Sequence, residues 1–282
     1  MRSVALGLLP APTYPVSAGA AAVRPHEPVA GWRGWCLLAA LLALAMALAP
    51  PLATAARRTE YAQALQFSLL AVVLPALTAL GAPWCRVGPA GNGFLCTFAD
   101  RLADRRRHRR EWPRALGFVA CDLAAAVAWH TPAAVAASAR HGWLAPLEAV
   151  CLLLVGLGLW LELVVSPPLV PRSGHLRRAA LAAVAMWVFW VMAYVSGLST
   201  HGFYRNFHHV AGGLSSAADQ QIASAVLWLA TTLAFAPLVF WNALQWLKTE
   251  DPDTELQTLT RDERRRGTAP LTGRMGGGAP LS

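Results

Sequence analysis

The sequence predicts an all-α protein, a polytopic membrane helical bundle of about six transmembrane helices. Two observations lead to this fold class. Of the 282 residues, 56% are hydrophobic and only 14% are charged, whereas about 25% of the residues in an ordinary soluble domain are charged. The apolar residues also gather in runs long enough to cross a bilayer, separated by short polar stretches. Together these features exclude a soluble enzyme, a secreted disulfide-rich scaffold and a disordered chain.

Six apolar segments have the length of about 20 residues that a transmembrane helix needs. Because lipid offers the backbone no hydrogen-bond partner, each segment must be helical. Prolines stand where a helix end or kink tolerates them, as at Pro50, Pro75 and Pro132. The predicted membrane domain covers 34–248, with spans at roughly 35–55, 62–82, 115–133, 143–165, 179–198 and 222–247.

The two ends of the chain are predicted to be disordered tails. In 1–33, the apolar patch Val4–Leu9 is too short for the core of a cleavable signal peptide, and prolines follow it. In 249–282, charged residues, Gly and Pro are frequent, which is typical of disorder.

The basic residues predict the orientation in the membrane. Lys and Arg number 24 against 15 Asp and Glu. With the N-terminus inside, only four basic residues fall outside, namely Arg57, Arg58, Arg140 and Arg205. Since cytoplasmic loops are enriched in Lys and Arg, this favours an N-in, C-in protein of the inner (plasma) membrane with both termini cytoplasmic. The Arg-rich run 105–110 lies among acidic residues and has no aromatic ladder for stacking bases, so we expect no nucleic-acid partner.

Polar side chains gather at the predicted outer ends of four helices. Polar groups within a membrane are costly and mark functional sites by default. Imidazole, thiolate and carboxylate are also ligands for copper and other transition metals. The pattern therefore predicts a polar or metal-handling pocket that opens outward, with copper as the candidate cofactor. Its candidate residues are Gln63, Gln66, His130, Glu148, Cys151, Asp219 and Gln221.

Each of these residues also has a structural interpretation. Gln63 and Gln66 suit hydrogen bonds between helices, which is the commoner use of amides in a bundle. His130 follows a tryptophan and suits the membrane interface. Asp219 suits a helix N-cap, and Cys151 suits packing as a small apolar residue.

Two further groups of residues extend the candidate set. The carboxylates Asp122 and Glu162 lie deep in apolar runs, where they fit a proton or cation relay. For Glu162 the structural interpretation, with Arg172 nearby at the inner interface, is the preferred one. The predicted outer loop carries His201, His208 and His209, which suit either a metal site or a solvated loop.

Several stretches together resemble the CtaG family, the multi-span membrane factors for cytochrome c oxidase assembly. The first runs from Trp35 to Pro83, with Ala-Pro-Pro-Leu closing one helix and Leu-Gly-Ala-Pro closing the next. The second is Trp129-His130-x-Pro132 followed by Trp143-x-x-Pro-Leu-Glu148. The third is Asp219-Gln220-Gln221 with Leu227-Trp228 further along the helix.

The resemblance implies a membrane protein that helps a haem–copper oxidase to mature, with copper handling as the suggested means and without catalytic turnover. It implies oxidase subunits or a copper chaperone as partners, besides membrane lipid. It also implies that His130, Asp219 and Gln221 belong to an outward-facing polar site.

This chain departs from the family at positions that matter for copper. Where the second helix of the family typically reads His-Met-x-Gln-His, residues 62–66 read Ala-Gln-Ala-Leu-Gln. Where a histidine typically follows Leu-Glu in the fourth helix, Ala149 stands here. Since amides are poor copper ligands, the chain resembles a divergent member that lacks three expected imidazoles.

Two other functions fit the sequence. A small cation or proton transporter would use Asp122, Glu162 and His130 as its path. A structural subunit of a respiratory complex would keep only a degenerate site. An enzyme is not expected, because no nucleophile and base stand at a readable spacing.

Overall fold

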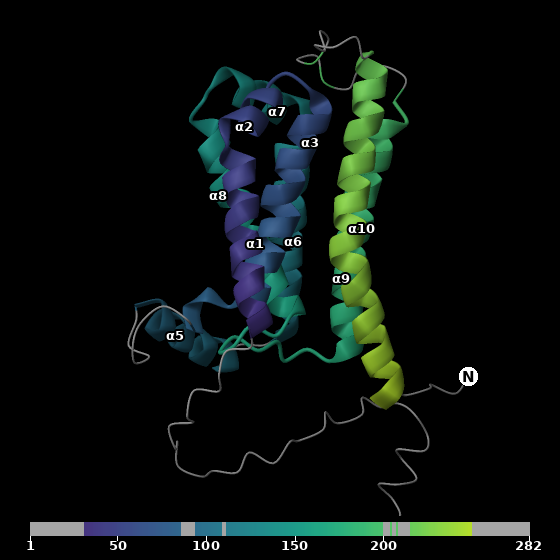
Figure 1. Ribbon diagram of the computed structural model, residues 1–282. Helices are drawn as coiled ribbons and strands as arrows, with labels where there is room; N and C mark the ends of the chain where they lie inside the picture. The colour runs from purple at the N-terminus through teal and green to yellow at the C-terminus, as the bar shows by residue number, and fades with distance from the viewer. Residues whose placement is uncertain are drawn as a thin grey trace, which may run out of the picture.

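The computed structural model describes residues 31–85, 94–108, 111–199, 204, 207 and 215–249. All regular structure in these residues is helical, and the long helices run side by side (Figure 1). Five of the described helices are long and apolar enough to cross a membrane, and a bent pair supplies a sixth crossing if it is counted as one span. The predicted all-α membrane bundle is therefore confirmed.

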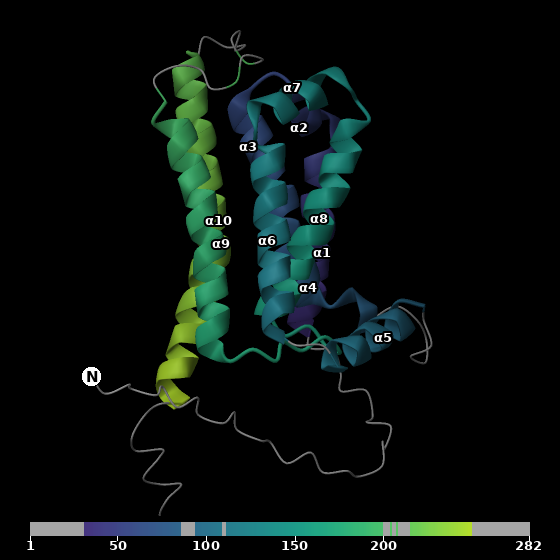
Figure 2. The same ribbon diagram turned by 180° about the vertical axis from the view of Figure 1, so that it is seen from behind.

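The crossings follow the chain in alternating directions (Figures 1 and 2). They are α1 (Gly31–Leu48), the continuous α3–η1–α4 segment (Glu60–Ser68, Leu69–Val73, Leu74–Gly81), α6 (Glu111–Trp129), α8 (Leu144–Leu163), α9 (His175–Gly197) and α10 (Ser216–Thr249). The start of α1 and the end of α10 consequently lie at the same end of the bundle.

Short helices mark the two ends of the bundle. At one end lie α2 (Pro50–Ala55) and α7 (Pro132–Arg140), and at the other lie η2 (Pro83–Cys85) and α5 (Phe94–His108). The arginine distribution predicts that the end with α2 and α7 faces outward, and it is called the outer end below. The opposite end is called the inner end.

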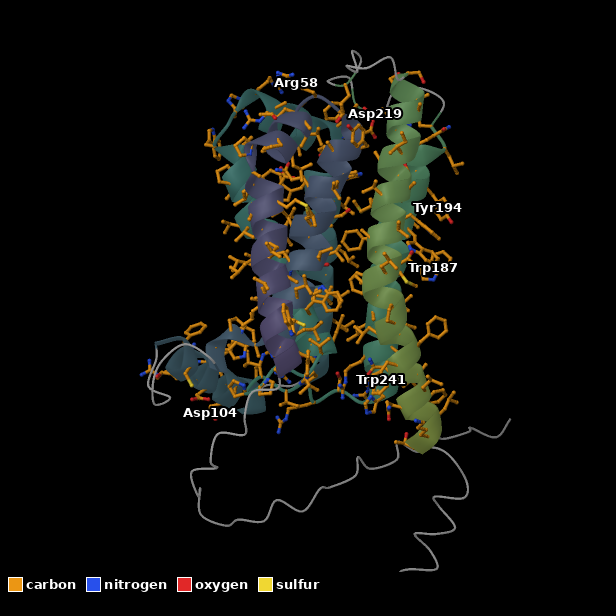
Figure 3. All side chains as sticks on the ribbon, in the orientation of Figure 1. Arg58, Asp104, Trp187, Tyr194, Asp219 and Trp241 are labelled. Atoms are coloured by element: carbon orange, nitrogen blue, oxygen red, sulfur yellow. The ribbon has the colours of Figure 1, made fainter. Side chains whose placement is uncertain are left out.

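The helices form two groups that pack against each other. Helices α1, α4 and α8 pack against the η1 segment and α6 packs on α8, while α9 and α10 form an antiparallel pair that packs on α3 and α6. Between α8 and this pair, the ring of Phe235 stacks on Trp160 and Phe189 with centroids 5.0 and 6.3 Å apart. On the other side of the pair, Trp187 and Tyr194 are exposed and point away from the bundle (Figure 3).

Two helices end before the predicted spans do, because prolines follow them. The segment predicted as 35–55 breaks at Ala49, whose backbone is extended, and Pro50 starts α2. The segment predicted as 115–133 ends at Trp129, and α7 then turns away by 66°. Thr131 caps α7, since its side chain accepts a hydrogen bond from the Ala134 N–H at 3.3 Å.

The second crossing contains a π-helical turn next to a proline. In η1 the Leu74 N–H bonds to the Leu69 carbonyl, five residues back. Pro75 follows at once, and a proline has no N–H for the ladder while its ring crowds the carbonyl four residues earlier. The wider π turn accommodates this ring within a continuous helix.

Helix α5 occupies part of the segment 83–114, which was predicted only as a basic loop. It lies across the inner end, nearly perpendicular to the crossings (Figure 1). Its side chains Ala99, Ala103 and Arg106 are buried against the bundle, whereas Phe98 is exposed. This placement brings Arg106 under α8.

Candidate functional site

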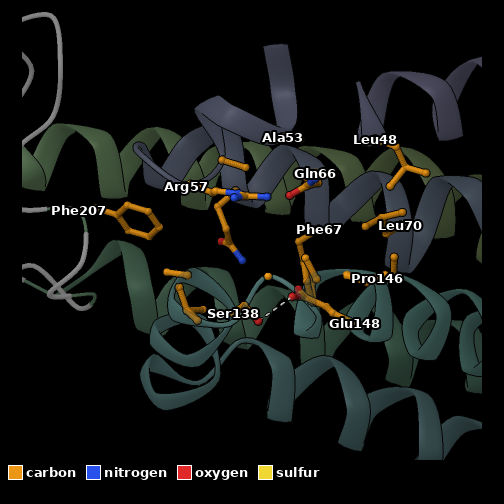
Figure 4. A pocket seen from close by; sticks show the side chains of 17 residues that line it. Leu48, Ala53, Arg57, Gln66, Phe67, Leu70, Ser138, Pro146, Glu148 and Phe207 are labelled. Atoms are coloured by element: carbon orange, nitrogen blue, oxygen red, sulfur yellow. Dashed lines mark hydrogen bonds between the residues drawn. The ribbon is translucent and has the colours of Figure 1, made fainter. Parts of the chain in front are cut away.

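A partly open cavity of about 260 Å³ lies at the outer end. The chain from α1 to α3 supplies one wall and α7–α8 supplies the other (Figure 4). Most of its lining is apolar, with Phe67 and Leu70 from the second crossing among the larger side chains. Its polar lining consists of Arg57, Gln63, Gln66, Ser138 and Glu148.

Three of the predicted site residues, Gln63, Gln66 and Glu148, thus meet in this cavity although they come from two different helices. Gln66 has a clear structural task, because its Nε2 donates to the Ala47 carbonyl at 2.7 Å. In a continuous helix this carbonyl would accept from residue 51, but Pro51 has no N–H. Gln66 therefore repairs the break between α1 and α2, as the interhelical interpretation of this residue anticipates.

Glu148 and Gln63, the other two predicted residues in the cavity, make fewer hydrogen bonds within the described part of the protein. Glu148 accepts one hydrogen bond, from the Ser138 hydroxyl on α7 at 3.3 Å. The Gln63 Oε1 atom is buried and has no hydrogen-bond partner among the described residues. A buried acceptor without a partner costs about 1–3 kcal/mol. The cavity therefore retains acceptor capacity that a bound group can satisfy.

Arg57 adds a positive charge to the cavity, although it lies outside the predicted spans. It follows α2 in the turn toward α3, and it is exposed although it lines the cavity. In Figure 4, Arg57 and Gln66 lie on one side of the cavity, with Ser138 and Glu148 on the other. The two opposite charges thus stand on opposite walls.

Asp219 lies beside this cavity and caps a helix other than its own. Its carboxylate is fully buried and accepts from the backbone N–H groups of Glu60 at 2.7 Å and Tyr61 at 3.0 Å. These are the first two amides of α3, whose own N-cap residue Thr59 makes no side-chain cap. A carboxylate also complements the positive end of the α3 dipole. Asp219 therefore fixes the start of α3 against α10.

His130 stands in an aromatic cluster beside the cavity, against Phe67, which lines it. Its ring lies 5.2 Å from Phe67 and 5.8 Å from Tyr204, centroid to centroid. The Tyr204 hydroxyl donates to the His130 carbonyl at 2.7 Å. Burial, followed by the charge of Glu60, raises the pKa of Tyr204 above its ordinary value, so the phenol stays a donor. The His130 Nδ1 atom is buried without a partner among the described residues.

The remaining predicted site residues lie elsewhere. Cys151 is a half-buried free thiol outside the cavity lining, and Gln221 is exposed. Its neighbour Gln220 is the buried amide, and it donates to the carbonyls of Ser196 and of Ser199, the latter at 3.1 Å. The loop histidines His201, His208 and His209 lie outside the described residues.

Glu162 forms a buried ion-pair network at the inner end. Its Oε1 lies 2.7 Å from Arg106 Nη2, and Arg114 binds both carboxylate oxygens at 3.0 Å. Burial lowers the pKa of the Arg106 guanidinium, while the Glu162 charge acts in the opposite direction. Glu162 thus joins α5 and α6 to α8, through Arg106 and Arg114 instead of the Arg172 named from the sequence.

Asp122 is the second deep carboxylate. It lies near the middle of α6, where it shares a buried face with Val119 and Ala126. It is far along the helix from Arg114, so the two predicted intramembrane carboxylates do not form one site.

The cavity does not fit a copper ion. Among the 17 described residues that line it there is no histidine, cysteine or methionine. Nor do the described parts of the chain contain a group of three or more His, Cys, Asp or Glu side chains placed to hold a metal. Copper prefers imidazole and sulfur donors, whereas this cavity offers amides, one carboxylate and one hydroxyl.

The comparison with known families gives one match that covers most of the chain. A family described as cytochrome c oxidase caa3 assembly factor (Caa3_CtaG) matches residues 14–249. No curated protein and no solved structure matches the chain. The matched range includes all six crossings and the cavity between them.

Proposed function

Because the chain belongs to the cytochrome c oxidase caa3 assembly factor family, we propose that it assists the assembly of a haem–copper oxidase within the cell membrane. The family match over 14–249 is the observation that carries this proposal. An assembly role needs no chemical turnover, and we propose that the chain is not an enzyme. Its partners are then oxidase subunits, which it meets in the bilayer or at its surface.

We assign the proposed assembly function to the outer end of the molecule. Asp219, Gln66 and Gln220 are engaged in joining helices, and they stabilise the frame of the outer end. The cavity within that frame keeps polar groups that the fold uses little, above all Glu148 and Gln63. Buried polar capacity of this kind in a membrane protein favours a functional role.

Copper handling at the outer face stays a prediction. The cavity does not supply copper donors, so we derive no copper transfer through it. Copper handling by this chain would depend on the loop histidines His201, His208 and His209. An assembly role through contact with an oxidase subunit needs none of these donors.

The alternative function in cation transport loses one of its three proposed groups. Glu162 is held by two guanidinium groups at 2.7–3.0 Å, so a passing cation would meet a site that is already neutralised. Asp122 and His130 remain, but they lie on different parts of α6 and the turn after it. We therefore favour the assembly function.

The proposal is tested in a strain from which the gene for this chain has been deleted. We expect terminal oxidase activity and haem a absorbance in the membranes to fall, and a plasmid copy of the gene to restore both. The same measurement with added copper separates the two modes of action. Restoration by copper alone supports copper handling, while no restoration by copper supports action by protein contact. Unchanged oxidase activity at both copper levels would contradict the assembly role.

A further inference from the structure

The cavity at the outer end is lined by two oppositely charged side chains that do not pair with each other. Arg57 and Glu148 both line it, one from the turn after α2 and the other from α8. They form no ion pair with each other, and among the described residues Glu148 has only the Ser138 hydroxyl as its hydrogen-bond partner. Two unlike charges held apart on facing walls suit a ligand that carries both signs.

The hydrogen-bond acceptors in the cavity indicate which cationic group such a ligand carries. A primary ammonium has three N–H donors and no acceptor. The Glu148 carboxylate supplies charge-assisted acceptors, and the unpartnered Gln63 Oε1 supplies another. A quaternary ammonium would leave these acceptors unsatisfied because it has no N–H.

The Arg57 guanidinium indicates which anionic group the ligand carries. Arg57 presents a planar guanidinium, whose N–H donors match phosphate oxygens in a two-pronged contact. It lies at the exposed side of the cavity, while Glu148 is partly buried behind it. The anionic group of the ligand therefore faces outward and its ammonium faces inward.

Size and position favour a lipid headgroup as the source. Since a water molecule takes about 30 Å³ in the liquid, the cavity of about 260 Å³ holds roughly nine waters, or a group of similar size. It lies where α1 ends and α8 begins, which is the level of the lipid headgroups if these helices span the bilayer. Leu48 and Leu70 also line the cavity, and Leu48, which is exposed, offers a contact for an acyl chain.

We infer that the cavity binds a zwitterionic group made of a primary ammonium and a phosphate ester, as in the headgroup of phosphatidylethanolamine. The ammonium donates to Glu148 and to Gln63 Oε1, and the phosphate accepts from Arg57. The site then holds a lipid of the outer leaflet between α2–α3 and α7–α8. This binding is a property of the chain itself and does not require an oxidase subunit.

The first test compares two lipids that differ only in methylation of the amine. The purified full-length protein is exchanged into nanodiscs made of phosphatidylethanolamine and phosphatidylcholine in equal amounts, then extracted, and the retained lipid is identified by mass spectrometry. We expect about one phosphatidylethanolamine per chain and at least tenfold enrichment over phosphatidylcholine, because only the primary amine donates hydrogen bonds. Equal retention of the two lipids would overturn the proposal, and this outcome does not depend on any variant.

The second test uses variants of the two charged walls. We expect Glu148→Gln and Arg57→Gln each to reduce the enrichment about tenfold, which corresponds to the loss of one charge-assisted contact. Arg58→Gln is the matched control, since Arg58 is exposed next to Arg57 and does not line the cavity. Undiminished enrichment in both cavity variants, or an equal loss in the control, would overturn the assignment of the site.

A third arm separates the lipid from a free zwitterion. Soluble O-phosphoethanolamine is titrated into the detergent-solubilised protein, and thermal unfolding is followed. No shift in the wild-type protein, together with retained phosphatidylethanolamine, supports the lipid as ligand. A shift that Glu148→Gln removes supports the same chemistry from a free source. If the wild-type protein shows no lipid selectivity while deletion of its gene still lowers oxidase activity, the binding site is overturned and the assembly role stands.

Discussion

At the scale of single residues, the polar side chains of the membrane domain divide into those that join helices and those that face the cavity. Asp219 belongs to the first kind, since it caps α3 from a position 159 residues further along the chain. Glu162 does too, as the acceptor for two arginines. Glu148 and Gln63 belong to the second kind.

Replacement of Asp219 tests its role as a cap across two helices. We expect Asp219→Asn to lower the free energy of unfolding by about 2 kcal/mol, because an amide replaces one acceptor oxygen with a donor that faces a backbone N–H. Thermal unfolding of the protein in detergent measures the loss. Gln221→Ala, at an exposed site on the same helix turn, is expected to leave stability unchanged. Equal stability of the Asn variant and wild type would contradict the cap.

Replacement of Glu162 tests the buried ion-pair network. We expect Glu162→Gln to cost about 3–5 kcal/mol, because Arg106 and Arg114 would be left buried without a counter-charge. Chemical unfolding in detergent checks the value, and Arg101→Gln on the exposed side of α5 is the control. A small effect of Glu162→Gln would mean that solvent reaches these guanidinium groups.

The sequence predicted which residues of the outer end are unusual, but not which task each performs. Polar residues in apolar runs are visible in a single chain, and so Gln63, Gln66 and Glu148 were identified. The cap that Asp219 forms was not visible, because the α3 amides that it binds are distant in the sequence. Arg57 and Ser138 were missed because both residues lie outside the predicted spans.

At the scale of elements, close packing explains the irregular second crossing. Gly156 in α8 lies against the π-helical turn, where an added Cβ would stand 2.9 Å from the Ala71 carbonyl oxygen and 2.8 Å from Pro75 Cγ. Only a residue without a side chain lets α8 approach the backbone this closely. The π turn and Gly156 therefore act as one packing unit below the cavity.

Substitution of glycine tests this packing. We expect Gly156→Ala to lower the free energy of unfolding by about 1–3 kcal/mol through overpacking. Gly117→Ala is the matched control, because a Cβ at Gly117 meets nothing within 4 Å and alanine favours the helix by about 1 kcal/mol. Thermal unfolding of both variants decides the question, and a neutral Gly156→Ala would contradict the close approach of α8 to η1.

The positions of the helices were predictable because the length of an apolar run and the presence of proline are local properties of the sequence. The interruptions of the helices at prolines were harder to predict. The doublet Pro50-Pro51 and Pro132 each ended a helix, whereas Pro75 was absorbed by a π turn. Which outcome a proline produces depends on the neighbouring helices that satisfy the freed carbonyls, as Gln66 does for Ala47. Helix α5 escaped prediction because its composition is that of a basic loop.

At the scale of the whole molecule, the arginine distribution makes a topological prediction. A reporter fused after Thr249 is expected to be cytoplasmic, so a green fluorescent protein fusion should fluoresce and an alkaline phosphatase fusion should be inactive. Fusions within 200–214 are expected to behave in the opposite way. An active phosphatase after Thr249 would mean that the orientation is opposite to the predicted one and that the cavity lies at the cytoplasmic face.

The central claim is that an assembly factor acts through the cavity at its outer end. The most direct test is the restoration of oxidase activity in the deletion strain by two neighbouring variants. Ala149→Phe fills the cavity that Ala149 lines, whereas Val150→Phe places the same ring at a residue that is 53% exposed on the outside of the helix. With equal amounts of both proteins in the membrane, we expect Val150→Phe to restore oxidase activity and Ala149→Phe to fail to restore it. Full restoration by Ala149→Phe would contradict the central claim.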